Sequence, residues 1–110
     1  LAALVPQNLE AKITVTGQIN RPPLELTSTQ SLFERAKKVN ADLGRPPLVG
    51  VSVGGVSDGN FAAAVGAPTL DGLGAIGGGA HAQGEWVKAD SIDSQITFIN
   101  ALITDLIERP

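Results

Sequence analysis

The sequence predicts an α/β fold in which helices pack on a small sheet. Apolar residues recur with the period of an amphipathic helix in two long segments, 27–43 and 91–110. Between them lies a short apolar run, residues 48–53, whose β-branched side chains are typical of a buried strand. A chain of 110 residues with 43% hydrophobic residues is long enough to form one core in a single globular unit.

Residues 11–19 predict a further strand near the N-terminus. Their apolar residues, from Ile13 to Ile19, alternate with polar ones, which is the period of a strand with one buried face. Pro22 and Pro23 follow. Because proline lacks a backbone donor and fixes φ, we expect neither a strand nor a helix to continue through them. A stiff connector is therefore predicted, and it marks a candidate domain boundary.

The helix at residues 27–43 has both a start signal and a stop signal. Thr27 offers a hydroxyl N-cap, and Gln30, three residues later, offers the amide of a capping box. Gly44 supplies the position at which helices often end in the left-handed conformation. The apolar residues of this helix that recur at helical spacing are Leu32, Ala36, Val39 and Leu43.

A glycine turn and a short helix follow the strand at residues 48–53. Ser57 or Asp58 can cap a helix of about two turns that ends at Gly66. We expect at least one of Gly54, Gly55 and Gly59 to have a positive φ in the turn.

Two more elements complete the prediction. Thr69 and Leu70 begin a last strand, whereas residues 71–80 contain too many glycines for a confident helix or strand. Asp90 or Ser91 caps an amphipathic helix that reaches the C-terminus. The apolar positions of this helix are Ile92, Ile96, Ile99, Ile103 and Leu106.

Composition excludes several classes of function. The net charge of −3 comes without a cluster of Lys or Arg, so nucleic acid is not an expected partner. No apolar run approaches the roughly 20 residues that span a bilayer, and the first ten residues lack the features of a signal peptide. We therefore expect a soluble protein without a membrane partner, in the cytoplasm, with a periplasmic or secreted location left open. The absence of Met indicates a piece of a longer polypeptide.

The glycine-rich stretch 48–87 holds the only histidine, His81, and most of the candidate functional residues. Without cysteine, metal ligands must come from this imidazole and from carboxylates. A histidine in a glycine-rich loop is more often structural than a ligand, but Glu85, four residues on, could accept a hydrogen bond from its second ring nitrogen as around bound metals. Ser52, in Gly-Val-Ser-Val-Gly, matches a nucleophile elbow, although it lies in mid-strand rather than on a turn.

Four motifs together resemble one known family. Arg21-Pro22, GGVSDGN (54–60), GAPTLDGLG (66–74) and GGGAHAQGEWV (77–87), followed by a closing amphipathic helix, resemble the C-terminal portion of the zinc-dependent exopeptidase and deacylase family. That family includes glutamate carboxypeptidase, acetylornithine deacetylase, succinyl-diaminopimelate desuccinylase and aminoacylase. The resemblance covers nearly the whole chain, and LDGLG is closest to the glutamate carboxypeptidase branch.

The resemblance implies a fold, a domain division and partners. The chain would be the C-terminal lobe of a co-catalytic zinc exopeptidase. Residues 1–22 would be the end of an inserted α+β dimerisation (lid) domain and its connector, with 11–19 as that domain's last strand. Residues 23–110 would belong to the catalytic domain. The implied partners are the N-terminal remainder of the same protein, a second copy in a homodimer, and a small-molecule or peptide substrate with a free carboxylate.

The resemblance also implies a site and a reaction. His81 would be the last protein ligand of a site for two zinc ions, with cobalt or manganese as alternatives, and Glu85 would support it. Arg21 would bind the substrate carboxylate, and a loop would line the pocket for cleavage of an amide bond in an N-acyl amino acid or at a C-terminal residue. The loop residues implied in substrate binding are Gly55, Ser57, Asp58, Gly59 and Asn60.

No catalytic residue is expected within these 110 residues, because the family's other metal ligands and its catalytic glutamate lie in an N-terminal half. The chain alone should therefore be inactive. Two alternatives stay open: a serine hydrolase that uses Ser52 and His81, and a non-catalytic binding or assembly module.

Overall fold

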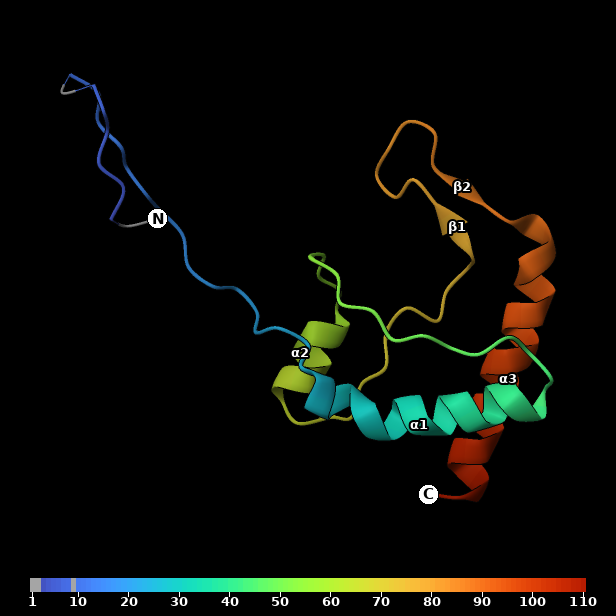
Figure 1. The fold of residues 1–110 in the computed structure, drawn as a ribbon. Coiled ribbons are helices and arrows are strands. Elements are labelled where there is room, and N and C mark those ends of the chain that lie inside the picture. The colour runs from blue at the N-terminus through green and yellow to red at the C-terminus, as the bar shows by residue number, and fades with distance from the viewer. Residues whose placement is uncertain (1–2, 9) are drawn as a thin grey trace.

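A computed structural model describes residues 3–8 and 10–110. The long helices are α1 (Leu26–Asp42) and α3 (Ile92–Glu108), with the short helix α2 (Gly59–Ala64) between them (Figure 1). A 3₁₀ turn, η1 (Ala89–Ser91), leads into α3. The described residues contain one sheet, an antiparallel pair of β1 (Gly77–Gly78) and β2 (Trp86–Val87), in which Gly77 lies opposite Val87 and Gly78 opposite Trp86. The chain thus combines helices with a small sheet.

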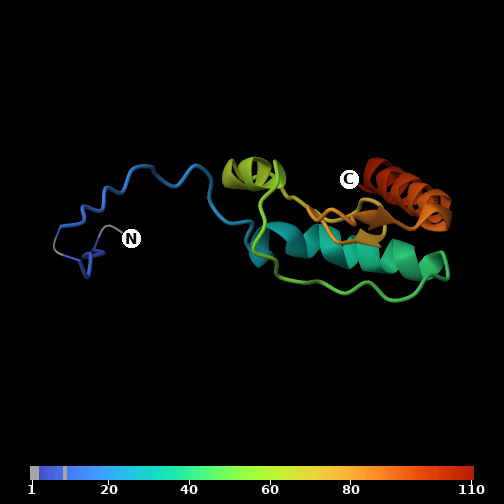
Figure 2. The same cartoon turned by 90° about the horizontal axis from the view of Figure 1, so that it is seen from above.

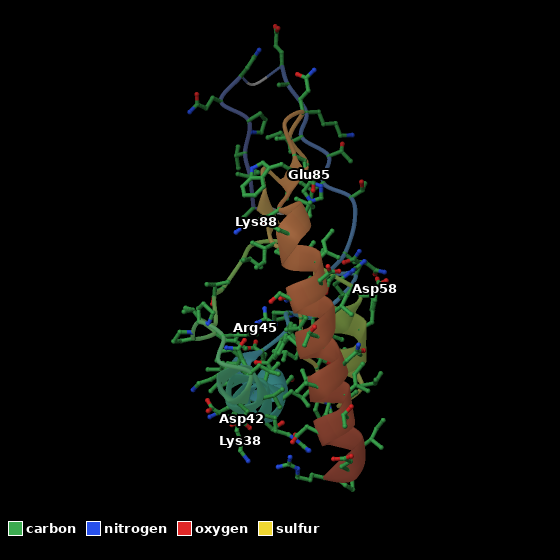
Figure 3. The ribbon with its side chains drawn as sticks, turned by 90° about the vertical axis from the view of Figure 1, so that its right-hand side faces the viewer. Lys38, Asp42, Arg45, Asp58, Glu85 and Lys88 are labelled. Atoms are coloured by element: carbon green, nitrogen blue, oxygen red, sulfur yellow. The ribbon has the colours of Figure 1, made fainter. Side chains whose placement is uncertain are left out.

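The core lies where α1 crosses α3. Its buried apolar residues are Ala36 and Val39 from α1 and Phe98 and Leu102 from α3, and Phe98 is fully buried. Full burial of such a side chain contributes about 1.5–3 kcal/mol. Figure 3 views α1 end-on beside α3, and Arg45, just after α1, bonds to Gln95 of α3 through its Nη2 (2.6 Å to Oε1).

The predicted end of α1 is confirmed, but its predicted start is wrong. Gly44 has φ +66°, the left-handed conformation expected just after a helix. The N-cap position is Glu25 rather than Thr27, and it makes no side-chain capping bond. Thr27 lies inside the first turn, so it cannot form the capping box predicted with Gln30.

The three predicted strands at residues 11–19, 48–53 and 69–70 are not formed within the described part of the chain. A strand forms only where a neighbouring strand accepts and donates its backbone hydrogen bonds. None of the three segments has such a neighbour among the described residues. Ile13, Val15 and Ile19, the apolar side of the first segment, are 44–88% exposed. The apolar pattern identifies segments that could form strands, but it does not show whether other strands lie beside them.

Only part of the apolar stripe predicted for α3 packs on α1: Ile99 and Leu106 lie against the core, beside residues outside that stripe. Ile92, Ile96 and Ile103 of the predicted stripe are 42–51% exposed, whereas Phe98 and Leu102 are buried. Phe98 and Leu102 are four residues apart and therefore lie on one face of the helix. α3 consequently carries a second apolar stripe that α1 does not cover.

The shape of the molecule is open. The Cα radius of gyration is 19.4 Å, against about 13 Å for a compact domain of this length. Residues 10–20 form an extended arm that leads away from the helices (Figures 1 and 2). Of the predicted first unit, 1–22, residues 1, 2 and 9 lie outside the described residues, and the division at residue 22 stays a prediction. In the part of the chain that the structure describes, no helix is long and apolar enough to span a membrane.

Candidate functional site

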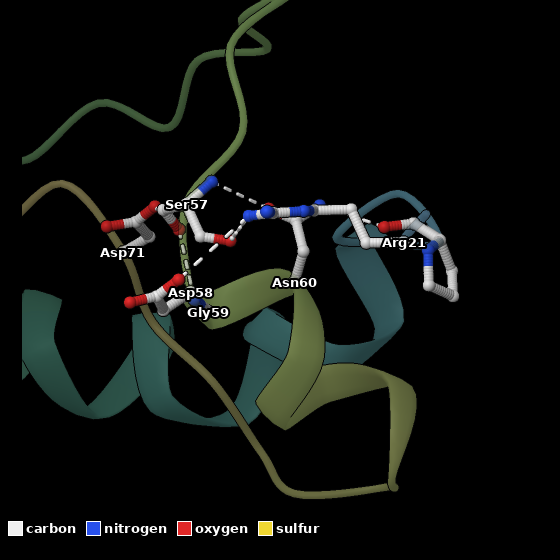
Figure 4. Close-up of polar contacts among 7 residues, drawn as sticks. Arg21, Ser57, Asp58, Gly59, Asn60 and Asp71 are labelled. Atoms are coloured by element: carbon white, nitrogen blue, oxygen red, sulfur yellow. Dashed lines mark hydrogen bonds and ion pairs between the residues drawn. The ribbon is translucent and has the colours of Figure 1, made fainter. Parts of the chain in front are cut away.

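Arg21 contacts the loop that leads into α2, as Figure 4 shows. Its Nη1 donates a hydrogen bond of 3.0 Å to the backbone oxygen of Ser57, 36 positions along the chain. The same nitrogen lies 4.0 Å from Asp58 Oδ1, and the guanidinium lies 4.2 Å from the centre of the Phe61 ring. The Arg21 side chain is 20% exposed. The connector therefore presents Arg21 in a fixed position beside the loop, not as a free surface cation.

Asn60 joins the connector to the loop. Its Nδ2 donates to the backbone oxygen of Pro22 at 2.9 Å, and its Oδ1 accepts from the backbone N–H of Ser57 at 2.9 Å. Only 5% of Asn60 is exposed. Both ends of the amide are thus used for backbone contacts, so Asn60 positions Arg21 and Ser57 rather than facing a ligand.

Ser57, rather than Asp58, caps α2 through its side chain. Asp58 stands at the N-cap position of α2 but makes no side-chain capping bond, whereas Ser57 Oγ accepts from the backbone N–H of Gly59 at 3.1 Å. With the bond from the Ser57 N–H to Asn60 Oδ1, this resembles a capping box, except that the serine side chain binds the second N–H after it rather than the third. The Asp58 carboxylate is left exposed beside Arg21.

The predicted positive φ in the glycine turn is wrong for this loop. None of Gly54, Gly55 and Gly59 adopts it, although no helix or strand runs through residues 53–58. Gly59 lies in a tight place instead, since a Cβ there would lie 3.1 Å from Ser57 Oγ and 3.2 Å from Thr69 Cγ2, and these side chains would have to shift slightly. Gly55, also predicted to line the pocket, is exposed.

Asp71 completes the cluster and was absent from the predicted site. Ser57 Oγ donates to Asp71 Oδ2 at 2.6 Å, and the backbone N–H of Gly72 donates to Asp71 Oδ1 at 2.7 Å. The Ser57 bond, followed by the Gly72 bond, lowers the pKa of Asp71, against a smaller raising effect of burial. Asp71 is therefore an anion at neutral pH that anchors the loop. Its position in LDGLG, fourteen residues from Ser57, gave no local signal of this contact.

His81 lies in the turn that connects β1 to β2. Its φ is +65°, the only positive φ of a non-glycine residue in the described chain. The turn is closed by backbone bonds from Ala82 N to Gly79 O (2.9 Å) and from Glu85 N to Ala82 O (3.1 Å). A non-glycine residue in this conformation costs about 1–3 kcal/mol and is often found at functional positions. The imidazole is exposed at the end of the hairpin.

The predicted contact between His81 and Glu85 is not formed. Among the described residues, neither side chain makes a hydrogen bond or an ion pair. Glu85 instead borders a shallow hollow of about 240 Å³ on the hairpin, together with Gly78 and Trp86. The 79–85 turn is held by main-chain hydrogen bonds. Its conformation therefore does not depend on a contact between the side chains of His81 and Glu85.

The structure brings together one half of the predicted site and leaves the other half apart. Arg21, Ser57, Asp58, Gly59 and Asn60 form one cluster, while the hairpin with Glu85 lies away from Asp58 (Figures 1 and 3). No group of three or more side chains that could hold a metal ion occurs in the described residues. Within the same residues, Ser52 and His81 make no hydrogen bond to each other.

A second hollow, of about 280 Å³, lies between α1 and α3 and is bordered by Asp42, Asp105 and Arg109. It contains none of the predicted site residues, and Asp105 on its border is paired with Arg35 and with Arg109.

Comparison of the sequence and structure with family models, with curated proteins and with solved structures finds no match.

Proposed function

We propose that this chain is the C-terminal lobe of a metal-dependent amide hydrolase of the zinc-dependent exopeptidase and deacylase family, closest to the glutamate carboxypeptidase branch. The substrate would be an N-acyl amino acid or a peptide with a free C-terminal carboxylate. The proposal is supported above all by the contact between Arg21 and Ser57, because the two motifs implied in substrate binding are 36 positions apart yet meet at 3.0 Å. The homodimer, with residues 11–19 as an edge of its dimerisation domain, belongs to the same proposal.

Arg21 would hold the substrate carboxylate. Its Nη1 is held by the Ser57 carbonyl and its Cζ lies 4.2 Å from the centre of the Phe61 ring, and these two contacts restrict the rotation of the guanidinium. Arg21 Nη2 makes no hydrogen bond to a described residue and is left for a ligand. A guanidinium that is already oriented loses less entropy when it binds a carboxylate, so a fixed fork favours recognition of that group.

Asp58 would set the orientation of the substrate by repulsion. Its carboxylate is exposed and lies 4.0 Å from Arg21 Nη1. A substrate carboxylate would therefore approach Arg21 from the side away from Asp58, since like charges repel at this range. The position of Asp58 thus favours one direction of approach of the substrate carboxylate to Arg21.

His81 would supply one metal ligand from the hairpin. Its ring is exposed and has no hydrogen-bond partner among the described residues, so a nitrogen is free to coordinate. When bound, two metal ions would polarise the amide carbonyl and lower the pKa of a bound water. The remaining ligands and the general base must come from outside these 110 residues.

Replacement of His81 in the full-length enzyme tests the proposal. His81→Ala should lower the metal content from two ions towards one per chain and remove most of the hydrolysis of an N-acyl glutamate. Circular dichroism should remain unchanged, because His81 is exposed and packs on nothing in the core. Gln83→Ala, in the same turn, is the matched control and should keep both metal and turnover. Wild-type metal content and turnover in His81→Ala would refute the assignment.

A further inference from the structure

Asp71 lies in an irregular segment that is nevertheless fixed at both ends. The described residues 69–73 form neither a helix nor a strand. The side chains of Leu70 and Leu73, on either side of Asp71, pack against the core that α1 and α3 form. Between the two leucines, Gly72 has φ +78°, a left-handed conformation that turns the chain. Asp71 therefore stands in an exposed turn whose two ends are anchored on the helices.

Gln95 of α3 holds the backbone of this turn. Its Nε2 donates to the backbone oxygen of Leu73 at 3.0 Å, and its Oε1 accepts from Arg45 Nη2 at 2.6 Å. Because a guanidinium only donates, Arg45 binds the amide oxygen of Gln95 and thereby directs the amide nitrogen towards Leu73. Arg45 is itself held by the backbone oxygen of Ser94 at 3.0 Å, and its Cζ lies 4.7 Å from the centre of the Phe98 ring. The end of α1 and the start of α3 thus fix the Leu73 carbonyl together.

Asp71 in turn holds Ser57, all of whose polar groups are engaged (Figure 4). The backbone N–H of Ser57 donates to Asn60 Oδ1 at 2.9 Å. Its Oγ donates to Asp71 Oδ2 at 2.6 Å and accepts from the backbone N–H of Gly59 at 3.1 Å. Its carbonyl accepts from Arg21 Nη1 at 3.0 Å. The carbonyl that orients Arg21 therefore belongs to a residue whose position Asp71 helps to set.

We propose that Gln95 is a positioning residue for recognition of the substrate carboxylate, although it belongs to the helix pair and not to the Arg21 cluster. Gln95 fixes the Leu73 carbonyl at one end of the turn. Asp71, two residues earlier, is thereby held where it meets Ser57, and the Ser57 carbonyl orients Arg21. The carboxylate as ligand of Arg21 rests on the proposed function, whereas the coupling of Gln95 to Asp71 does not depend on it.

The chemistry of the amide allows the two bonds of Gln95 to be separated by substitution. The position requires a side chain that accepts from Arg45 and donates to Leu73 at the same time, and an amide does both. Glutamate would keep the bond to Arg45 and lose the bond to Leu73, because a carboxylate only accepts. Methionine, of similar length and without charge, would lose both bonds. An effect that runs through the turn should therefore appear in both variants.

Steady-state kinetics of the full-length enzyme test the inference. Gln95→Met and Gln95→Glu should both raise KM for an N-acyl glutamate by about tenfold with kcat close to wild type, because a remote shift misplaces the binding group. A substrate amide that lacks the carboxylate should keep its KM. Gln95→Met should also lower the melting temperature, since it removes the bond to Arg45, and Gln95→Glu should not. Thr97→Ala, which removes a hydroxyl bonded to the Asp93 backbone oxygen within α3, is the matched control and should keep the wild-type KM.

Two further measurements on the full-length enzyme follow the coupling itself. Carboxyl ¹³C titration of Asp71 needs no activity. In Gln95→Met, which adds no charge, its midpoint should rise towards that of an ordinary aspartate, because the Ser57–Asp71 bond is loosened. The double variant Ser57→Ala, Gln95→Met should have the KM of Ser57→Ala alone, since residues that act through one network are not additive.

The outcomes separate this inference from the proposed function. A wild-type KM in Gln95→Glu, an unmoved Asp71 midpoint in Gln95→Met, or additive effects in the double variant would overturn the inference. An equal rise in KM for the substrate without a carboxylate would also overturn it, because the whole site would then be disturbed. If the enzyme hydrolyses no N-acyl amino acid but the Asp71 midpoint moves, the proposed function fails and the coupling stands. If hydrolysis depends on Arg21 and Gln95→Glu keeps the wild-type KM, this inference alone fails.

Discussion

The amide of Asn60 donates a 2.9 Å hydrogen bond to the backbone oxygen of Pro22, across 38 positions of the chain. This bond fixes the connector against the start of α2 and thereby sets where Arg21, the residue before Pro22, can reach. Only 5% of Asn60 is exposed. A polar side chain buried with both ends paired is a strong determinant of local geometry, because loss of one partner leaves the other group unsatisfied.

We therefore expect Asn60→Ala to weaken substrate binding in the full-length enzyme without contacting the substrate. Loss of the two bonds should destabilise the loop by about 1–3 kcal/mol and raise KM more than it lowers kcat. Asn60→Asp is the informative control, since it keeps the oxygen that accepts from Ser57 but loses the donor to Pro22. Steady-state kinetics and thermal melting of both variants measure the effect. An unchanged KM in Asn60→Ala would show that the Pro22 bond does not position Arg21.

Arg21→Ala should lower kcat/KM for a substrate with a free carboxylate by about tenfold or more, from loss of a charge-assisted pair worth about 1.5–3 kcal/mol. If Arg21 stood on a fully exposed connector, its replacement by alanine would not change the free energy of unfolding. The contacts with Ser57 and Phe61 add a small destabilisation, of about 0.5–1 kcal/mol for the ring contact. For a substrate amide that lacks the carboxylate, wild type and Arg21→Ala should have the same kcat/KM.

Two variants control the Arg21 experiment. Arg21→Lys keeps the charge but loses the planar fork, so its kcat/KM should lie between those of wild type and Arg21→Ala. Lys37→Ala removes an exposed cation that pairs with Glu34 and lies 5.6 Å from the centre of the Phe33 ring, within its own helix, and should leave the kinetics unchanged. Wild-type values of kcat and KM in Arg21→Ala would show that Arg21 does not bind the substrate and has only a structural role.

Sequence patterns anticipated the helices well and the strands poorly, for one physical reason. A helix satisfies its own backbone, so the spacing in residues 27–43 and the glycine at 44 were sufficient to predict α1 and its end. A strand at 48–53 is decided by its neighbours, and these are absent from the described residues. The face of α3 that packs was predicted only in part: Ile99 packs against the core as expected, but Ile96 and Phe98 both lie on apolar sides of the helix, and only the position of α1 decides between them.

The cluster around Arg21 was predictable in most of its members but not in their roles. The resemblance assigned Arg21 and Asn60 to substrate binding, and the two do lie in one cluster. Only the structure distinguishes the guanidinium, which retains a nitrogen for a ligand, from the amide, whose two ends are engaged in backbone contacts. Asp71 was missed as a site residue because its bond to Ser57 is set by tertiary folding rather than by spacing along the chain.

The Ser57–Asp71 bond should make the loop sensitive to acid. The pKa of Asp71 is lowered in the folded chain, so protonation of Asp71 disfavours the folded loop. The stabilisation is thus complete above the ordinary pKa of an aspartate and is lost as the pH falls through the lowered pKa. Carboxyl ¹³C titration should give a midpoint below the ordinary value, and Ser57→Ala should raise it. An Asp71 midpoint that does not respond to Ser57→Ala would show that the bond is absent in solution.

Phe98 should dominate the stability of the 110-residue chain. It is fully buried, with Arg45 Cζ 4.7 Å from its ring centre, and among the described residues the buried apolar core has only four members. Phe98→Ala should lower the free energy of unfolding by about 3–5 kcal/mol in urea titrations. Ile96→Ala, two residues earlier on the half-exposed stripe, should cost much less. Comparable losses in both variants would mean that α3 packs through the isoleucine stripe in solution.

The ion pair between Arg35 and Asp105 should couple the packing of α1 on α3 to pH. Arg35 Nε donates to Asp105 Oδ2 at 2.9 Å and its Nη2 donates to the Asp105 backbone oxygen at 2.6 Å, so one guanidinium holds the side chain and the main chain of α3. The hydrogen bond from Arg35 is the main cause that lowers the pKa of Asp105, and the charge of Arg109 adds to it.

Because the lowered pKa belongs to the folded state, the pair stabilises the chain above the ordinary aspartate range and stops doing so as the pH falls through the lowered pKa. Asp105→Asn should therefore lower the melting temperature at pH 7 and leave it close to wild type at pH 2. Glu34→Gln, which removes an exposed carboxylate paired with Lys37 on the same helix as Arg35, should have little effect at either pH. Thermal melting of the three proteins between pH 2 and 7 measures this. A constant difference between Asp105→Asn and wild type over that range would show that the Asp105 side chain acts through packing and not through its charge.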